Sequence, residues 1–163
     1  MNRTVRYLSR QDVRAACAGI DTVAAVREAV LAHSRGEAML PAEACLRWIT
    51  PSGAKARNLN MPGYVGGAIA RAGTKIINAN AANPDNGIPR ASGICLLFDP
   101  ETAQVVCIMD ATYISATRTA SVTVLAGDIV MLNPFGMAIE DIVIAVRVYE
   151  AAESLKMGVE LLL

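Results

Sequence analysis

The 163-residue sequence is poor in aromatic side chains and has no excess of charge of either sign. Phe, Trp and Tyr make up only 4% of it, whereas hydrophobic residues of all kinds make up 53%, so a core must be mainly aliphatic. Basic and acidic residues number 15 each. A net charge of zero does not favour binding to nucleic acid or to an anionic membrane. The length fits a single domain.

Long apolar runs are also missing. The longest, 142–148, is interrupted by Arg147 and is too short to span a bilayer. The N-terminal sequence Met-Asn-Arg-Thr-Val-Arg-Tyr lacks the apolar stretch of a signal peptide. We therefore expect a cytoplasmic protein. The four cysteines lie in separate apolar segments, at Cys17, Cys45, Cys95 and Cys107. They have no metal-binding spacing, so we expect reduced core side chains rather than disulfides.

The residue patterns of several common kinds of site are absent. The only histidine, His33, is predicted near the exposed end of a helix and has no evident partner. No Ser/His/Asp set and no cluster of metal ligands is evident. The glycines in 63–67 do not form a dinucleotide fingerprint, because no strand–turn–helix unit surrounds them. We therefore expect no bound metal and no nucleotide cofactor.

The remaining pattern predicts an α+β fold, a largely antiparallel sheet with helices packed on one side of it. Short segments bounded by turn residues predict strands at 5–8, 44–50, 57–61, 68–78, 93–99, 104–109 and 129–132. Polar caps and helical spacing predict helices at 10–18, 22–35, 111–126 and 134–156, capped by Ser9, Asp21, Asp110 and Asn133. Pro62-Gly63 is expected to end the third strand. The Asn-, Pro- and Gly-rich segment 80–90 is expected to be a long and functional loop.

One lysine stands out because only three are present and it lies in a strand that reads as buried. Lys75 follows Ala-Gly-Thr and precedes Ile-Ile. A desolvated ammonium is costly unless it meets an anion or loses its proton. Lys75 is therefore a candidate binding or catalytic group.

Other polar residues could join it. Arg47 interrupts an apolar strand, Arg90 lies in the long loop, and Arg118 and Thr119 lie in a helix rich in small residues. Cations that converge on one pocket would clamp a carboxylate, since guanidinium groups bind it through two hydrogen bonds. The alternative is that each cation pairs with an acid or extends into solvent. We assign Glu140 and Asp141, near the start of the last helix, mainly to its dipole.

Several motifs together resemble one known family. They are Asn60-Met-Pro-Gly-Tyr-Val-Gly-Gly67, Ala72-Gly-Thr-Lys-Ile-Ile-Asn78, Asn83-Pro-Asp-Asn-Gly-Ile-Pro-Arg-Ala-Ser92, Leu96-Leu-Phe-Asp-Pro-Glu-Thr102, Ile114-Ser-Ala-Thr-Arg-Thr-Ala120, Asn133-Pro-Phe-Gly-Met-Ala-Ile-Glu-Asp141 and Leu155-Lys-Met-Gly158. With them, essentially the whole chain resembles the ornithine cyclodeaminase/mu-crystallin family. Members of that family are about twice as long, because a Rossmann NAD(P) domain is inserted into a substrate-binding and dimerisation domain.

The resemblance implies that residues 1–163 form the substrate-binding domain. It would consist of an N-terminal segment, residues 1–126, and a return segment, residues 127–163, with the Rossmann insertion missing between them. The resemblance also implies a homodimer in which the sheets complete a barrel-like interface. The family's catalytic aspartate belongs to the missing domain. We therefore expect no NAD(P) site in this chain.

The resemblance also implies roles for individual residues. Arg47, Lys75 and Arg118 would bind the carboxylate of a small amino or imino acid, and Met61 would line the pocket. Thr119 would lie where the nicotinamide docks in the family. Leu59 replaces the acidic substrate contact of ornithine cyclodeaminase, which argues against ornithine as the substrate.

These expectations leave three interpretations open. The first is a cofactor-independent enzyme of lyase, cyclase, hydrolase or isomerase type, with Lys75 as its catalytic group and with Arg47, Arg90 and Arg118 among its substrate contacts. The second is a non-catalytic dimeric amino-acid-binding module or scaffold. The third is an engineered domain deletion of an NAD-dependent cyclodeaminase or amino-acid dehydrogenase.

Overall fold

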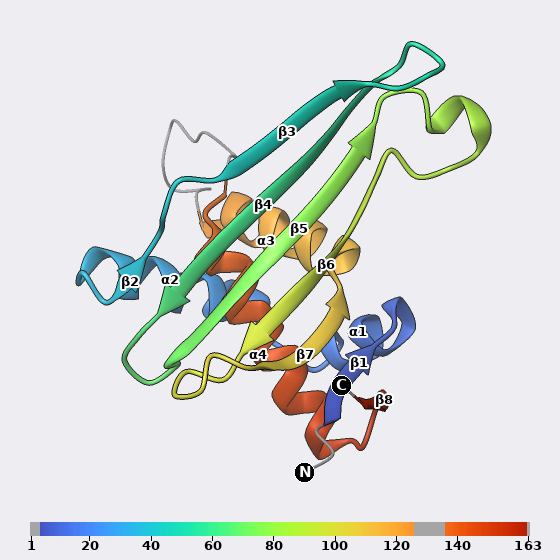
Figure 1. The fold of residues 1–163 in the computed structure, drawn as a ribbon. Helices are drawn as coiled ribbons and strands as arrows, with labels where there is room; N and C mark the ends of the chain where they lie inside the picture. The colour runs from blue at the N-terminus through green and yellow to red at the C-terminus, as the bar shows by residue number, and fades with distance from the viewer. Residues whose placement is uncertain (1–3, 126–135, 163) are drawn as a thin grey trace.

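The computed structural model describes residues 4–125 and 136–162, which form one sheet with helices packed on one face of it (Figure 1). The strands are β1 (Thr4–Leu8), β2 (Ala38–Met39), β3 (Ala44–Ile49), β4 (Lys55–Val65), β5 (Arg71–Asn80), β6 (Ala91–Phe98), β7 (Val105–Asp110) and β8 (Val159–Leu162). The helices are α1 (Arg10–Cys17), α2 (Thr22–Ser34), α3 (Ala111–Leu125), α4 (Ala138–Ser154) and the short 3-10 helix η1 (Pro84–Asn86). The predicted α+β architecture is confirmed.

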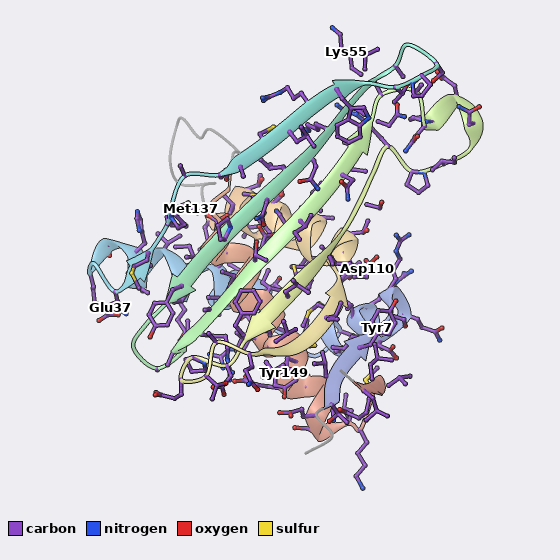
Figure 2. The ribbon with its side chains drawn as sticks, in the orientation of Figure 1. Tyr7, Glu37, Lys55, Asp110, Met137 and Tyr149 are labelled. Atoms are coloured by element: carbon purple, nitrogen blue, oxygen red, sulfur yellow. The ribbon has the colours of Figure 1, made fainter. Side chains whose placement is uncertain are left out.

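The strands follow the order β2-β4-β5-β6-β7-β1-β8, and β3 also pairs with β4. Every pairing between the described strands is antiparallel except that of β1 with β7. The long strands β3, β4 and β5 extend beyond the helices at one end, so part of their helix-facing side is open (Figure 1). Figure 2 shows Lys55 at this far end and Glu37 near the opposite end of β4.

Local signals place the first two helices. Ser9 accepts a hydrogen bond from the backbone N–H of Asp12, and the Asp12 carboxylate accepts one from the N–H of Ser9, which makes a reciprocal capping box. Asp21 caps α2 by accepting from the N–H of Ala24. Both predicted caps are confirmed. Both helices end within one residue of their expected positions, at Cys17 and Ser34.

Helix α4 forms the centre of the core. All of its residues from 138 to 146 are buried. It packs against α1, α2 and α3 and also against β4, β5 and β6. A helix that is apolar nearly all round is expected in such a position. The free thiols Cys17, Cys95 and Cys107 are buried in the same core, as the sequence predicts, and Cys45 is half-buried.

Strand β4 continues through Pro62-Gly63, so the prediction that it ends there is wrong. The outer edge of β4 is paired with β3 as far as Asn60 and with β2 from Tyr64 onward. Pro62 falls in the gap between them, where its missing N–H costs no ladder bond. A Cβ on Gly63 would lie 3.1 Å from Ile142 Cδ1. The glycine thus lets α4 approach the sheet closely.

The last helix begins later than predicted, at Ala138 with Met137 as its N-cap residue, and it ends at Ser154 rather than at Lys156. Lys156 has a φ of 54°, which turns the chain toward β8. The expected cap at Asn133, the strand at 129–132 and the proposed deletion point at 126–127 lie outside the described residues. None of the helices described here is long and apolar enough for a membrane span.

Candidate functional site

Lys75 lies in the middle of β5 and points to the helix side of the sheet. It is 2% exposed, which confirms the predicted burial. Its neighbours in register are Met61 on β4 and Cys95 on β6. The Lys75 Nζ donates a hydrogen bond of 2.6 Å to Oδ2 of Asp141 and one of 3.3 Å to Oγ of Ser115. The ammonium is therefore buried together with its counterion.

Asp141 links Lys75 to Arg118. Its side chain is fully buried, and its Oδ1 accepts a hydrogen bond of 3.2 Å from Nε of Arg118. The assignment of Asp141 mainly to the helix dipole is therefore incomplete, because the carboxylate neutralises two buried cations from β5 and α3. Replacing such a carboxylate would leave unpaired charges in the core, which is far costlier than losing a surface pair.

Glu140 completes a group of four charges that we call the buried cluster: Lys75, Arg118, Glu140 and Asp141. Its Oε2 lies 3.5 Å from Nη1 of Arg118. Both atoms are buried, and neither has a hydrogen-bond partner among the described residues. Burial raises the pKa of Glu140, and the nearby Asp141 adds to this, while Arg118 and Lys75 act against it. The Arg118 guanidinium therefore keeps one free donor inside the protein.

Gly136 leaves room for this arrangement. A Cβ at this position would overlap Nη1 of Arg118 and Oε2 of Glu140. Because Gly136 has no side chain, the Arg118 guanidinium can occupy this position beside Glu140. The sequence gives no direct signal for this role, because it depends on the contact between α3 and the start of α4.

Thr119 lies one residue beyond Arg118 on α3. Its Oγ1 donates a hydrogen bond of 2.8 Å to the backbone oxygen of Ser115. A cavity of about 320 Å³ lies beside it, lined by Ile77, Ala91, Ser92, Thr112, Ser115, Ala116 and Thr119. Ser115 is also a hydrogen-bond partner of Lys75. The cavity therefore adjoins the buried cluster through Ser115, although no side chain of the cluster lines it.

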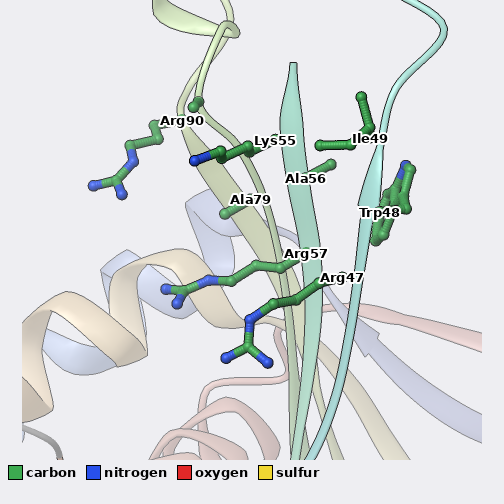
Figure 3. A pocket seen from close by; sticks show the side chains of 9 residues that line it. Arg47, Trp48, Ile49, Lys55, Ala56, Arg57, Ala79 and Arg90 are labelled. Atoms are coloured by element: carbon green, nitrogen blue, oxygen red, sulfur yellow. The ribbon is translucent and has the colours of Figure 1, made fainter. Parts of the chain in front are cut away.

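Arg47 and Arg90 are not part of the buried cluster. They are exposed and lie beyond the end of the helices, in a cavity of about 600 Å³ that we call the basic pocket (Figure 3). Its lining residues are Arg47, Trp48, Ile49, Lys55, Ala56, Arg57, Ala79, Ala81 and Arg90. The structure thus brings Lys75, Arg118 and Met61 together and gathers Arg47 and Arg90 elsewhere on the same sheet.

Sequence reasoning missed Asp141 as the partner of Lys75, and Lys55 and Arg57 as neighbours of Arg47. Two signals were present. Asp141 is one of the few charges in the apolar run 138–148, and a lysine in an apolar strand requires an anion. Arg57 lies across a short turn from Arg47 and pairs with it in register.

The described residues do not fit a nucleotide cofactor. Dinucleotides bind where parallel strands lead into helices through a Gly-rich turn. Here the only parallel pair among the described strands is β1 with β7. The strand β1 leads into α1 through Ser9, whose side chain caps the helix. No group of acidic, histidine or cysteine side chains in the described part of the chain is placed to hold a metal ion.

Comparisons with known proteins agree with the fold and the motifs. The chain is 38% identical over 130 residues to N-((2S)-2-amino-2-carboxyethyl)-L-glutamate dehydrogenase of Staphylococcus aureus (strain NCTC 8325 / PS 47), covering 77% of this chain and 39% of that protein. It is 29% identical over 114 residues to alanine dehydrogenase of Archaeoglobus fulgidus (strain ATCC 49558 / DSM 4304 / JCM 9628 / NBRC 100126 / VC-16), covering 70% of this chain and 33% of that protein.

Among solved structures, the crystal structure of CmnK is similar with a TM-score of 0.75 and 36% identity, over 91% of this chain and 48% of that one. The Δ(1)-pyrroline-2-carboxylate reductase of Thermococcus litoralis shares the fold with a TM-score of 0.70 at 22% identity, over 90% of this chain and 46% of that one. The chain therefore spans less than half the length of these relatives. Residues 4–128 match the ornithine cyclodeaminase/mu-crystallin family, and the chain belongs to that family.

Proposed function

We propose that this chain binds a small amino or imino acid and transfers protons to or from it at Lys75. The observation that carries the proposal is the buried cluster. It places a lysine, an arginine with a free donor and two acids inside the core, beside a cavity. Charges are costly to bury, and burial raises the pKa of Glu140 within the cluster, a kind of perturbation that is common at functional sites.

The free donor of Arg118 suits a carboxylate oxygen. Its Nε is held by Asp141, which fixes the direction of the guanidinium plane. Nη1 is left without a hydrogen-bond partner among the described residues. A substrate carboxylate at this position would receive a charge-assisted hydrogen bond. Met61, directly opposite Lys75 in register, would form an apolar wall of the site.

Lys75 would then act on the atom next to that carboxylate. Its ammonium is hydrogen-bonded to the Ser115 hydroxyl, which lines the cavity, so a proton donated to the substrate could be replaced through that hydroxyl. Proton transfer by a positioned side chain is the basis of lyase, cyclase and isomerase reactions. These are reactions that the described residues could support by themselves. Asp141 orients Lys75 and balances its charge.

Two of the named relatives are dehydrogenases and one is a reductase, and a nicotinamide would supply hydride transfer. Because the described residues do not fit a nucleotide, we assign no step to one. Residues 1–163 would correspond to the substrate-binding region of such an enzyme. A domain with the same binding site but without turnover is the alternative, and the same cluster would serve it. Proton exchange separates these two possibilities.

The proposal is tested by binding and by exchange. Titration calorimetry with amino and keto acids should show binding that Arg118→Gln weakens by about tenfold or more, which is one charge-assisted hydrogen bond. In D₂O, nuclear magnetic resonance should show deuterium entering the α position of a bound amino acid. The double variant Lys75→Met/Asp141→Asn removes both charges together and should abolish this exchange.

Each result has a distinct meaning. Binding without exchange would support a non-catalytic module. Unchanged exchange in the double variant would show that Lys75 is not the catalytic group. Thermal stabilisation by NADH or NADPH would contradict the expected absence of a cofactor site.

We also propose that the chain forms a homodimer through the face of the sheet that the helices do not cover. Leu46, Trp48 and Ile94 point away from the helices and are 64%, 43% and 38% exposed. Apolar patches of this kind mark interfaces. Sedimentation analysis should show a dimer for the wild type and a monomer for Ile94→Asp. A wild-type monomer would refute the proposal.

A further inference from the structure

The basic pocket contains cations that the protein itself does not neutralise. Arg47, Lys55, Arg57 and Arg90 form no ion pair and no side-chain hydrogen bond within the described chain. The pocket lining contains no acidic residue. Six other basic side chains of the described chain do have ion-pair partners, and none of them lines this pocket.

The arrangement within the pocket is unfavourable without a ligand. Arg47 and Arg57 lie directly opposite each other on β3 and β4. Like charges at such positions destabilise a sheet. Figure 3 shows both side chains reaching away from their strands toward the same side. An anion between them would turn this repulsion into two attractions.

The pocket and the buried cluster share one side of the sheet. Lys75, Ile77 and Ala79 alternate along β5 and point to the helix side, and Arg57 is paired with Ala79. Ala79 lies four positions after Lys75 along the strand, which is about 13 Å of backbone. Ile77 lines the smaller cavity and Ala79 lines the basic pocket. The two cavities thus follow each other along β5.

We infer that the basic pocket is a second anion subsite, which binds the distal acidic group of an elongated dicarboxylic amino acid. This inference rests on the proposed function, in which the amino-acid end lies at the buried cluster. Arg57 and Arg47 would hold the distal carboxylate, and Lys55 and Arg90 would add positive charge around it. Ile49, which lies on the same face of β3 as Arg47, would contact the apolar part of the ligand.

A carboxylate fits this pocket better than a long polyanion does. Guanidinium groups bind a planar carboxylate through paired hydrogen bonds. The four cations are confined to one cavity of a chain with zero net charge. A nucleic acid would need basic residues along an extended surface.

The test compares two ligands of equal chain length, α-aminopimelate with a distal carboxylate and α-aminoheptanoate without one. Titration calorimetry should show that the wild type prefers α-aminopimelate by about tenfold or more, as expected for a charged group bound by arginine. Arg57→Gln should remove this preference and leave the affinity for α-aminoheptanoate within about twofold. The preference should also decrease at high salt.

Arg14→Gln is the matched control, because Arg14 is an exposed arginine on α1, far from the pocket, without an ion-pair partner in the described chain. It should leave both affinities unchanged. Equal affinities for the two ligands in the wild type, or a preference that survives Arg57→Gln, would overturn the inference while leaving the proposed function intact. Binding of neither ligand would count against the proposed function itself, and binding of a single-stranded oligonucleotide lost in Arg57→Gln would replace the subsite by a nucleic-acid site.

Discussion

The buried cluster and the basic pocket lie on the same side of the same sheet but differ in whether their cations have an anionic partner within the described chain. In the cluster, Lys75 and Arg118 share one fully buried carboxylate. In the pocket, Arg47 and Arg57 face each other without any anion from the described chain. Both arrangements are unfavourable in isolation, one through desolvation and the other through repulsion. In the cluster, a carboxylate of the same chain neutralises the cations, whereas the cations of the pocket could be neutralised by an external anion.

Removing the carboxylate of the cluster should have the largest effect. Asp141→Ala would leave the charges of Lys75 and Arg118 in the core with only Glu140 nearby. We expect the free energy of unfolding to fall by about 3–5 kcal/mol, as measured by urea denaturation. Asp85→Ala is the control, because Asp85 is exposed in η1 and has no ion-pair partner in the described chain. It should change stability by less than about 0.5 kcal/mol.

A loss in Asp141→Ala as small as that of the control would mean that the cluster is not held by this carboxylate. The conservative variant Asp141→Asn keeps the shape of the side chain and should fall between the two. The three variants together separate the charge of Asp141 from its packing.

Glu140 should give a smaller effect that depends on pH. Burial raises its pKa above the ordinary value of 4.5. A raised pKa in the folded state means that Glu140 contributes stability below about pH 4.5, and that this contribution is lost as the pH rises through the raised value. Each unit of that shift corresponds to about 1.4 kcal/mol.

Glu140→Gln removes this titration. Denaturation at a series of pH values should therefore show the wild type losing stability relative to the variant as the pH rises above about 4.5. Parallel stability curves for the two proteins would contradict the raised pKa. The comparison is made between variants because other carboxylates also titrate in this range.

Much of the fold could be predicted because its signals are local. Ser9 and Asp21 mark helix starts by their side-chain hydrogen bonds, and those bonds need only the next few residues. The predicted end of β4 failed for the opposite reason. Pro62 is tolerated because β3 and β2 leave a gap beside it, and the position of that gap is a property of the whole sheet.

In the site, too, some features have local sequence signals and others depend on contacts between distant segments. The burial of Lys75 follows from its apolar neighbours in the strand, and the structure confirms it. Its partner is 66 residues away in sequence, and a carboxylate in the first turn of a helix already has a local explanation. The family resemblance groups Arg47 with Lys75. Its place beside Arg57 depends on a strand pairing that its own residues do not specify.

The smallest predicted effect has the opposite sign from the first. Arg57→Gln removes a cation that stands across from Arg47 and has no partner in the described chain. Relief of this repulsion should raise the free energy of unfolding by a few tenths of a kcal/mol, up to about 1, and the gain should shrink at high salt. Urea denaturation at low and high salt measures it, with Arg14→Gln as the control. Destabilisation by Arg57→Gln would show that the pocket's cations support the fold, whereas stabilisation would show that they cost stability in the absence of a ligand.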